Sequence, residues 1–293
     1  MSDKTITVFT PTYNRGYILP NLYNSLVNQT YKNFVWLIVD DGSTDNTKVM
    51  VEEWIKEGKI DIEYYYQENQ GKQIAMNLGA EKCNTELFDT VDSDDYMTPN
   101  ALKNIVEFWN KHKAENYAGI ISLRGKTEME SLTGSYMPER VLHCKYRALY
   151  EEYGFVGDSN QIYRTDVIRK YPYQLFPNEK FIAETAQFLQ IDDHYDMLLL
   201  NDISVICEYR EDGYSKNVKK LLKNNSLGYR YIKDLNYRHS KTLKGKFAEM
   251  IKYCCANFMC HDGQGYKLAA NKPMYLLCFI PGALCYLIFY KKA

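Results

Sequence analysis

The chain has 293 residues, of which 45% are hydrophobic and 25% are charged, and its formal net charge is −1. The hydrophobic content is typical of a folded globular protein and excludes a chain that is disordered throughout. The net charge near zero excludes a protein that is basic overall and binds nucleic acid through that charge.

The charge is unevenly distributed along the chain. Residues 216–293 contain 15 Lys and Arg against 3 Asp and Glu, a net charge of +12, which leaves −13 for residues 1–215. Such a contrast indicates two regions with different partners. We therefore predict an acidic region, 1–215, followed by a basic region, 216–293.

Residues 1–125 alternate between short apolar runs and stretches with helical spacing. Strands are predicted at 6–10, 34–39, 60–66, 87–91 and 117–123, and helices at 18–27, 44–54, 73–83 and 99–108. Strands separated by helices of this length form right-handed crossovers. The pattern predicts an α/β fold with a mostly parallel central sheet and helices on both faces.

The alternation ends after residue 125. We expect a loop at 126–138, isolated strands at 161–163 and 203–207, and a helix at 179–191 between them. From residue 216 onward the apolar spacing is helical. The eight cysteines lack paired CxxC spacing, which predicts free, buried thiols rather than a zinc site or a disulfide framework.

The basic region ends in an uncharged segment, 274–290, with lysines on both sides. A spanning helix needs about 20 apolar residues, and Pro281-Gly282 interrupts this segment midway. We expect a broken helix that inserts shallowly into an anionic membrane surface; a buried core helix is the alternative. The N-terminus has no signal-peptide pattern, so we expect a protein on the cytoplasmic face of the membrane.

Acidic residues follow three predicted strands. They are Asp40 and Asp41 after the second strand and Asp92, Asp94 and Asp95 after the fourth, while Thr10–Arg15 follows the first. Because parallel strands end at one edge of a sheet, ligands collect there. An acidic edge suits a divalent cation that in turn holds a diphosphate, with Asp41 free to accept from a nucleobase N–H. Solvated capping turns are the alternative reading.

Four motifs occur in a fixed order: PTYNR (11–15), VDDGSTDNT (39–47), NQGKQIAMNLG (69–79) and DSDD (92–95). This ordered set resembles the family 2 glycosyltransferases with the GT-A fold, over residues 6–215. The resemblance implies a nucleotide-binding half at 1–125 and an acceptor half at 126–215. It also implies a nucleotide-sugar donor, commonly a UDP-sugar, and Mn²⁺ or Mg²⁺ as cofactor.

The resemblance assigns roles to particular residues of the donor site. Pro11 and Tyr13 would line the base pocket, Asp41 would read the base edge, and Lys72 would contact the nucleotide. The turn Asp92-Ser93-Asp94 would bind the nucleotide sugar, with Asp94 and Asp95 as metal ligands.

The resemblance also implies a general base at the start of a helix in the acceptor half. Glu184 is the candidate there, with Asp192 or Asp193 as the alternative. A single displacement with such a base inverts the anomeric configuration. The family's histidine-containing loop corresponds to 208–215, where Arg210 or Ser215 would have to replace the histidine.

The acceptor predicted from the family and from the basic region is a saccharide hydroxyl, lipid-linked (polyprenyl-type), in cell-surface polysaccharide synthesis. Two other functions stay open: a nucleotidyltransferase on a similar sheet, and a non-catalytic module that binds a nucleotide or sugar. The aromatic residues of the basic region fit core and interface positions rather than a stacking platform for nucleic acid.

Overall fold

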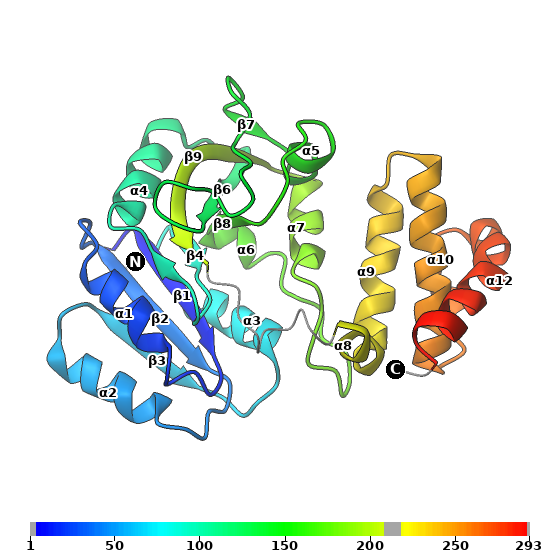
Figure 1. Ribbon diagram of the computed structural model, residues 1–293, viewed down its shortest axis with the longest axis horizontal. Helices are drawn as coiled ribbons and strands as arrows, with labels where there is room; N and C mark the ends of the chain where they lie inside the picture. The colour runs from blue at the N-terminus through cyan, green and yellow to red at the C-terminus, as the bar shows by residue number, and fades with distance from the viewer. Residues whose placement is uncertain (1–3, 208–217, 292–293) are drawn as a thin grey trace. The chain divides into compact units, whose positions relative to one another are not determined.

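The computed structural model describes residues 4–207 and 218–291 (Figure 1). These residues form two compact units, which we describe separately. The first comprises 4–172 and 190–207, and the second comprises 173–189 and 218–291. Residues 173–189, assigned above to the acceptor half, therefore belong to the second unit. The predicted boundary at residue 215 lies outside the described residues.

The first four long strands form the predicted parallel sheet, in the order β3-β2-β1-β4. Their bounds are β1 Ile6–Thr12, β2 Phe34–Asp40, β3 Ile62–Tyr66 and β4 Leu87–Thr90. The connecting helices are α1 Leu19–Val27, α2 Thr47–Glu57 and α3 Lys72–Lys82. Every residue of β1 and β2 is buried, as expected for central strands covered on both faces.

Helices cover both faces of this sheet, as predicted. One core unites α1, α2 and α4 (Ala101–His112) with the strand residues Val8, Trp36 and Ile38. The opposite face carries α3: the rings of Phe9 and Phe88 stack at 4.9 Å, and a Cβ on Gly79 of α3 would lie 2.2 Å from the ring of Phe9. Glycine at position 79 thus lets α3 approach the sheet closely.

Beyond β4 the sheet is mixed rather than parallel. β8 (Ser159–Arg164) pairs antiparallel with both β4 and β6 (Tyr117–Gly125), and so lies between them. β9 (Asp196–Ile206) runs parallel to β6, and the two-residue strands β5 (Tyr96–Met97) and β7 (His143–Cys144) pair antiparallel with β9. The predicted strand at 117–123 exists, but its neighbour comes from later in the chain.

Short helices complete the connections: α5 (Tyr146–Glu151), α6 (Thr165–Ile168) and α7 (Thr185–Asp192). The predicted helix at 179–191 begins only at Thr185. The Glu179 carboxylate instead accepts from the backbone N–H groups of Leu227 and Gly228, at 2.7 and 2.8 Å, in the first turn of α9.

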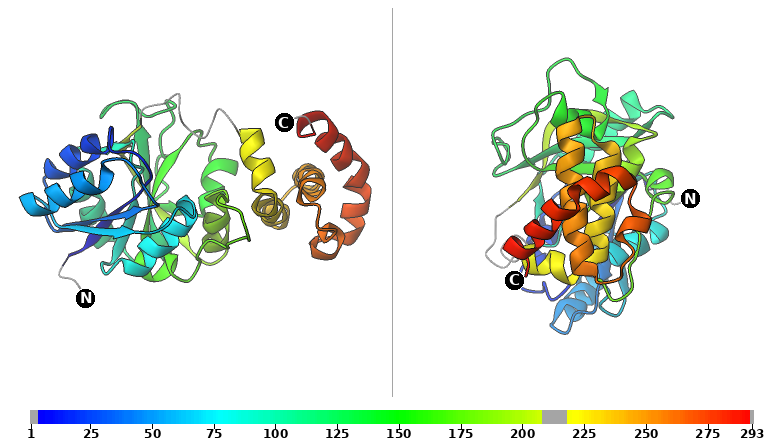
Figure 2. Two further views of the ribbon diagram at one scale, coloured as in Figure 1. Left: turned by 90° about the horizontal axis from the view of Figure 1, so that it is seen from below. Right: turned by 90° about the vertical axis from the view of Figure 1, so that its right-hand side faces the viewer.

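The rest of the second unit is helical, as predicted. It contains α8 Val218–Asn224, α9 Ser226–His239, α10 Leu243–Cys260, α11 Gly265–Leu268 and α12 Lys272–Phe289. Figure 2 shows α10 between α9 and α12. The eight cysteines are free thiols, as expected, and five of them are buried.

The interruption predicted at Pro281 is wrong, because α12 runs through this residue as one helix. The proline removes one backbone hydrogen-bond donor from the helix. Helix α12 nevertheless packs along α10. A Cβ on Gly282 would lie 2.3 Å from Cβ of Cys254 on α10. The glycine after the proline therefore allows α12 to pack closely against α10 at this position.

Candidate active site

The strand ends that carry the acidic motifs meet at one edge of the first unit. Thr12, the last residue of β1, pairs with Asp40, the last residue of β2, and Phe9 pairs with Thr90 at the end of β4. The turns that follow β1, β2 and β4 consequently begin side by side. This is the edge at which open α/β sheets bind ligands.

The turn after β1 is fastened to the turn after β2. The backbone N–H of Asn14 donates to Ser43 Oγ at 2.8 Å, and the N–H of Thr44 donates to Asn14 Oδ1 at 2.8 Å. Asn14 has a positive φ of 51°, which asparagine tolerates better than most residues. Of the two predicted base-pocket residues, Pro11 is buried within β1 and Tyr13 is 48% exposed.

Asp40, the last residue of β2, and Asp41, which follows it, are both buried and hydrogen-bonded. Asp40 accepts from the N–H of Ser43 and the hydroxyl of Tyr64, both at 2.7 Å. Asp41 accepts from Gln67 Nε2 at 2.7 Å and from the N–H groups of Gln70 and Gly71 at 2.8 Å.

Asp41 thus holds the segment 67–71, which leads directly into α3. Gly71 has a φ of 103°, a conformation that favours glycine. The resemblance implies that Asp41 reads the nucleobase, but its hydrogen bonds to this segment could not be predicted from the sequence.

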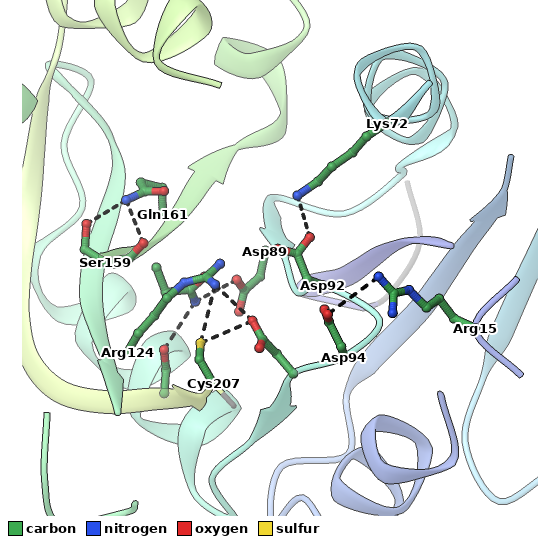
Figure 3. A network of polar contacts seen from close by, with 12 residues as sticks. Arg15, Lys72, Asp89, Asp92, Asp94, Arg124, Ser159, Gln161 and Cys207 are labelled. Atoms are coloured by element: carbon green, nitrogen blue, oxygen red, sulfur yellow. Dashed lines mark hydrogen bonds and ion pairs between the residues drawn. The ribbon is translucent and has the colours of Figure 1, made fainter. Parts of the chain in front are cut away.

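Lys72, the first residue of α3, reaches the turn after β4. Its Nζ lies 2.6 Å from Asp92 Oδ1, and both side chains are partly exposed (Figure 3). Burial raises the pKa of the Asp92 carboxyl, but the charges of Lys72, Arg124 and Arg15 outweigh this and lower the pKa below its ordinary value. Asp92 is therefore ionised at neutral pH.

The remaining acids of the turn differ in their surroundings. Asp94 is partly exposed, with Arg15 Nη2 at 3.9 Å from its Oδ2, whereas Asp95 is buried against Arg124 Nη1 at 2.9 Å. The thiol of Cys207, directly after β9, donates to Asp95 Oδ2 at 3.2 Å. Burial raises the pKa of Asp95 to about 6 although Arg124 lowers it. Ser93, between the acids, is also buried.

A further acid, Asp89, lies inside the sheet behind this turn (Figure 3). It is fully buried on β4, and its Oδ1 accepts from Asn160 Nδ2 of β8 at 2.9 Å, while its Oδ2 has no hydrogen-bond partner. Burial raises the pKa of Asp89 to about 7, although Asn160 and the charge of Arg124 lower it.

Arg124, Cys207 and Asp89 could not be identified from the sequence, because none of them belongs to a local motif. Cys207 and Asp95 are 112 residues apart in the chain. Their contact depends on the pairing of β5 with β9, in which Tyr96 lies opposite Ile206, and the sequence did not reveal this pairing.

The site is less acidic than the sequence suggested. Arg15, Lys72 and Arg124 each stand beside one acid of the turn, so negative and positive side chains alternate. Within 4–207 and 218–291 no three His, Cys, Asp or Glu side chains converge on a point where they would hold a metal ion by themselves. The arrangement can contribute one or two carboxylates to an ion that takes its other ligands from phosphate oxygens and water, which is how Mg²⁺ is usually bound.

The candidate general base lies in the second unit. Glu184 occupies the turn directly before α7, and its backbone carbonyl accepts from the N–H of Gln187 at 3.1 Å. Of the alternatives, Asp192 belongs to the first unit and accepts from the N–H groups of Tyr146 and Arg147, where it caps α5, and Asp193 is exposed. Arg210 and Ser215 lie outside the described residues.

Comparisons with known proteins agree with the motif order. GlyA from Streptococcus pneumoniae, named a glycosyltransferase, is 33% identical over 138 residues, 46% of this chain and 20% of GlyA. The match therefore spans only a small part of that longer relative.

Two solved structures share the fold. Residues 1–349 of TarS from S. aureus match with a TM-score of 0.60 and 19% identity, over 95% of this chain and 80% of TarS 1–349. A mannosyltransferase from Pyrobaculum calidifontis, solved with GDP-Man and Mn²⁺, matches with a TM-score of 0.57 and 15% identity, over 97% of this chain and 87% of its own. At these identities the likeness establishes the fold, the GT-A arrangement predicted from the sequence.

The family model described as glycosyl transferase family 2 matches residues 7–172, which include all four motifs and both sides of the turn after β4. That match covers more than half of the chain, so this protein belongs to glycosyl transferase family 2.

Proposed function

We propose that this chain is an inverting glycosyltransferase that moves a sugar from a UDP-sugar to a hydroxyl of a saccharide acceptor. The observation that carries the proposal is the alternation of Asp92, Asp94 and Asp95 with Lys72, Arg15 and Arg124 at the carboxyl edge of the sheet. A departing nucleoside diphosphate gains negative charge, and fixed positive groups at that place stabilise the transition state.

The choice of uridine rests on the first two turns and on TarS. Tyr13 exposes a ring that a base can pack against, beside Pro11, and Asp41 retains acceptor capacity on Oδ2 beyond its bond to Gly71. TarS has been solved with UDP-GlcNAc. In this proposal Lys72 contacts the diphosphate, and Asp92 and Ser93 bind the ribose side of the donor.

The cofactor in this proposal is Mn²⁺ or Mg²⁺, held by Asp94 with Asp95 as the second candidate. Asp94 is the better placed, because Arg15 Nη2 lies 3.9 Å from its carboxylate and its side chain is 27% exposed, whereas Asp95 is buried against Arg124 at 2.9 Å. When bound, the ion offsets the charge of the leaving diphosphate.

Glu184 is the proposed general base. The acceptor oxygen forms the new bond to the anomeric carbon as the bond from that carbon to the phosphate oxygen breaks. UDP leaves with the bonding electrons, and the acceptor proton passes to Glu184. One such displacement inverts the anomeric configuration. Asp192 is a weaker candidate because its carboxylate already caps α5.

We further propose that the enzyme works at the cytoplasmic face of the membrane, on a lipid-linked acceptor of surface polysaccharide synthesis. Supporting this, α12 is long and apolar enough to cross a membrane by length and composition, with a mean hydropathy of 1.6 and 17% of its residues buried. The net charge of +12 over residues 216–293 favours anionic lipid.

The test is the release of UDP or GDP from a panel of nucleotide sugars, with and without Mn²⁺, using membranes as the source of acceptor. Asp94→Asn should lower release at least about 100-fold, whereas Glu107→Gln, an exposed change on α4, should leave it unchanged.

Each other outcome has a defined meaning. Full turnover in EDTA would contradict the proposed metal cofactor. A preference for GDP-sugars would contradict the proposal that the donor is a UDP-sugar. Tight UDP binding without release from any donor would favour a binding module instead.

A further inference from the structure

The last helix, α12, has two different faces. Tyr275, Cys278 and Gly282 are buried against the rest of the second unit. The opposite face is made by apolar side chains that are between 54% and 71% exposed: Leu276, Leu277, Ile280, Leu284 and Ile288. Their spacing by about four residues places them in one stripe, which we call the α12 outer face.

The surroundings of the α12 outer face indicate what covers it. The only charged residue within α12 is Lys272, at its first turn, and the exposed Lys267 precedes it. At the other end Lys219 Nζ lies 5.6 Å from the ring centre of Phe289. An apolar stripe with lysines at both ends matches an anionic lipid interface. A second copy of the chain fits less well, because it would bring the same lysines together.

The inner face of α12 limits how the helix can meet the bilayer. Cys254 of α10 donates to the carbonyl of Tyr275 at 3.7 Å, and Cys278 donates to the carbonyl of Phe247 at 3.9 Å. Along α10, Glu249 pairs with Lys233 and Lys252. A membrane-spanning α12 would draw these charges into the hydrocarbon, where ionised side chains are strongly disfavoured.

We propose that α12 lies in the plane of the membrane, with its outer face inserted at the level of the headgroups and upper acyl chains and its inner face kept on α10. The helix length permits this orientation, because 18 residues extend about 27 Å, only just comparable to a hydrocarbon thickness of about 30 Å. This inference rests on the membrane location proposed above and adds the orientation and the contacting residues.

The orientation can be tested by introducing single tryptophans at 276, 280, 284 and 288 and quenching them with lipids brominated at different depths. The native tryptophans, Trp36, Trp54 and Trp109, are all buried in the first unit and give a constant background. The vesicles contain equal parts of phosphatidylglycerol and phosphatidylcholine. An in-plane helix predicts the same shallow depth at all four positions.

A spanning helix would place 280 and 284 deep and 276 and 288 shallow, and that pattern would overturn the proposal. Val49→Trp, an exposed change on α2, is the matched control and should show no quenching.

The variant Ile280→Glu tests membrane binding separately from catalysis. This change should lower partitioning onto the same vesicles about tenfold or more, while release of UDP with a water-soluble acceptor stays at the wild-type rate. Failure of the wild-type chain to bind vesicles, or a stable dimer in lipid-free solution that Ile280→Glu dissociates, would overturn membrane docking without affecting the transferase proposal. Loss of UDP release in every form, with vesicle binding intact, would instead count against the proposed function.

Discussion

Lys72 Nζ lies 2.6 Å from Asp92 Oδ1, so one ion pair joins the start of α3 to the turn after β4. The segment that places Lys72 is in turn held by Asp41 through the N–H groups of Gln70 and Gly71. Side-chain contacts therefore connect the segments that follow β2, β3 and β4.

The Lys72 pair gives the first prediction. Lys72→Ala should lower kcat/KM for the nucleotide sugar about 10- to 100-fold, the usual size for loss of a hydrogen bond to a charged group. Steady-state UDP release measures it. Lys82→Ala on the same helix, whose nearest acid is Glu81, serves as the control and should be neutral. Equal losses for both variants would mean that α3 itself has been disturbed.

A second prediction concerns Asp41, which holds the segment 67–71 and is also proposed to contact the nucleobase. In Asp41→Asn the amide nitrogen would face a backbone N–H, and a buried donor without a partner costs about 1–3 kcal/mol. We expect the free energy of unfolding to fall by this amount, measured in urea through tryptophan fluorescence, which reports on the first unit. Asp61→Asn, an exposed change, should cost little. Unchanged stability with weakened UDP binding would leave Asp41 as a base-contacting residue alone.

The third prediction concerns pH. The pKa of Asp89 is raised to about 7, so the folded state holds a proton that the unfolded state releases near pH 4. Stability from this group is present at low pH and is lost as pH rises from about 4 to about 7, by up to about 4 kcal/mol. Asp89→Asn should abolish this loss. Urea unfolding of both proteins at pH 5 and pH 8 tests it; an identical pH dependence in the two would show that Asp89 does not titrate in this range.

A fourth prediction concerns the second unit. Gly282→Leu should separate α10 from α12, because even a Cβ at this position would lie 2.3 Å from Cys254 Cβ. Overpacking of this kind typically costs about 1–3 kcal/mol. Thermal unfolding followed by circular dichroism should show a lower midpoint, whereas Ala248→Leu, at an exposed position of α10, should not. A normal midpoint in Gly282→Leu would mean that the α10–α12 contact contributes little.

The sequence predicts the helices and strands up to β4 well, because each of them follows from a local pattern of residues. Phe34–Val39 is a continuous apolar run between turns. Helix α3 begins directly after Gly71, whose positive φ favours glycine. The same logic found the acidic turn after β4, since Asp92, Asp94 and Asp95 directly follow a buried strand.

The partners of those acids could not be predicted. Arg124 lies near Asp95 because β5, which begins at the next residue, pairs with β9, and β9 runs beside β6. These pairings join distant parts of the chain through tertiary packing, which no local pattern predicts. At Pro281 the local rule predicts a break, but α12 is continuous there and packs closely against α10 at Gly282.

The grip of Asp41 on the segment 67–71 has a consequence for the energetics of ligand capture. Fixing a flexible stretch of backbone costs about 1–2 kcal/mol per residue in entropy, and here that cost is met when the chain folds. A nucleotide that binds beside residues 67–71 would not have to order this segment. The free energy of its contacts would then contribute to affinity rather than to ordering the protein. Loosening residues 67–71 should thus weaken binding even where no contact to the ligand is removed.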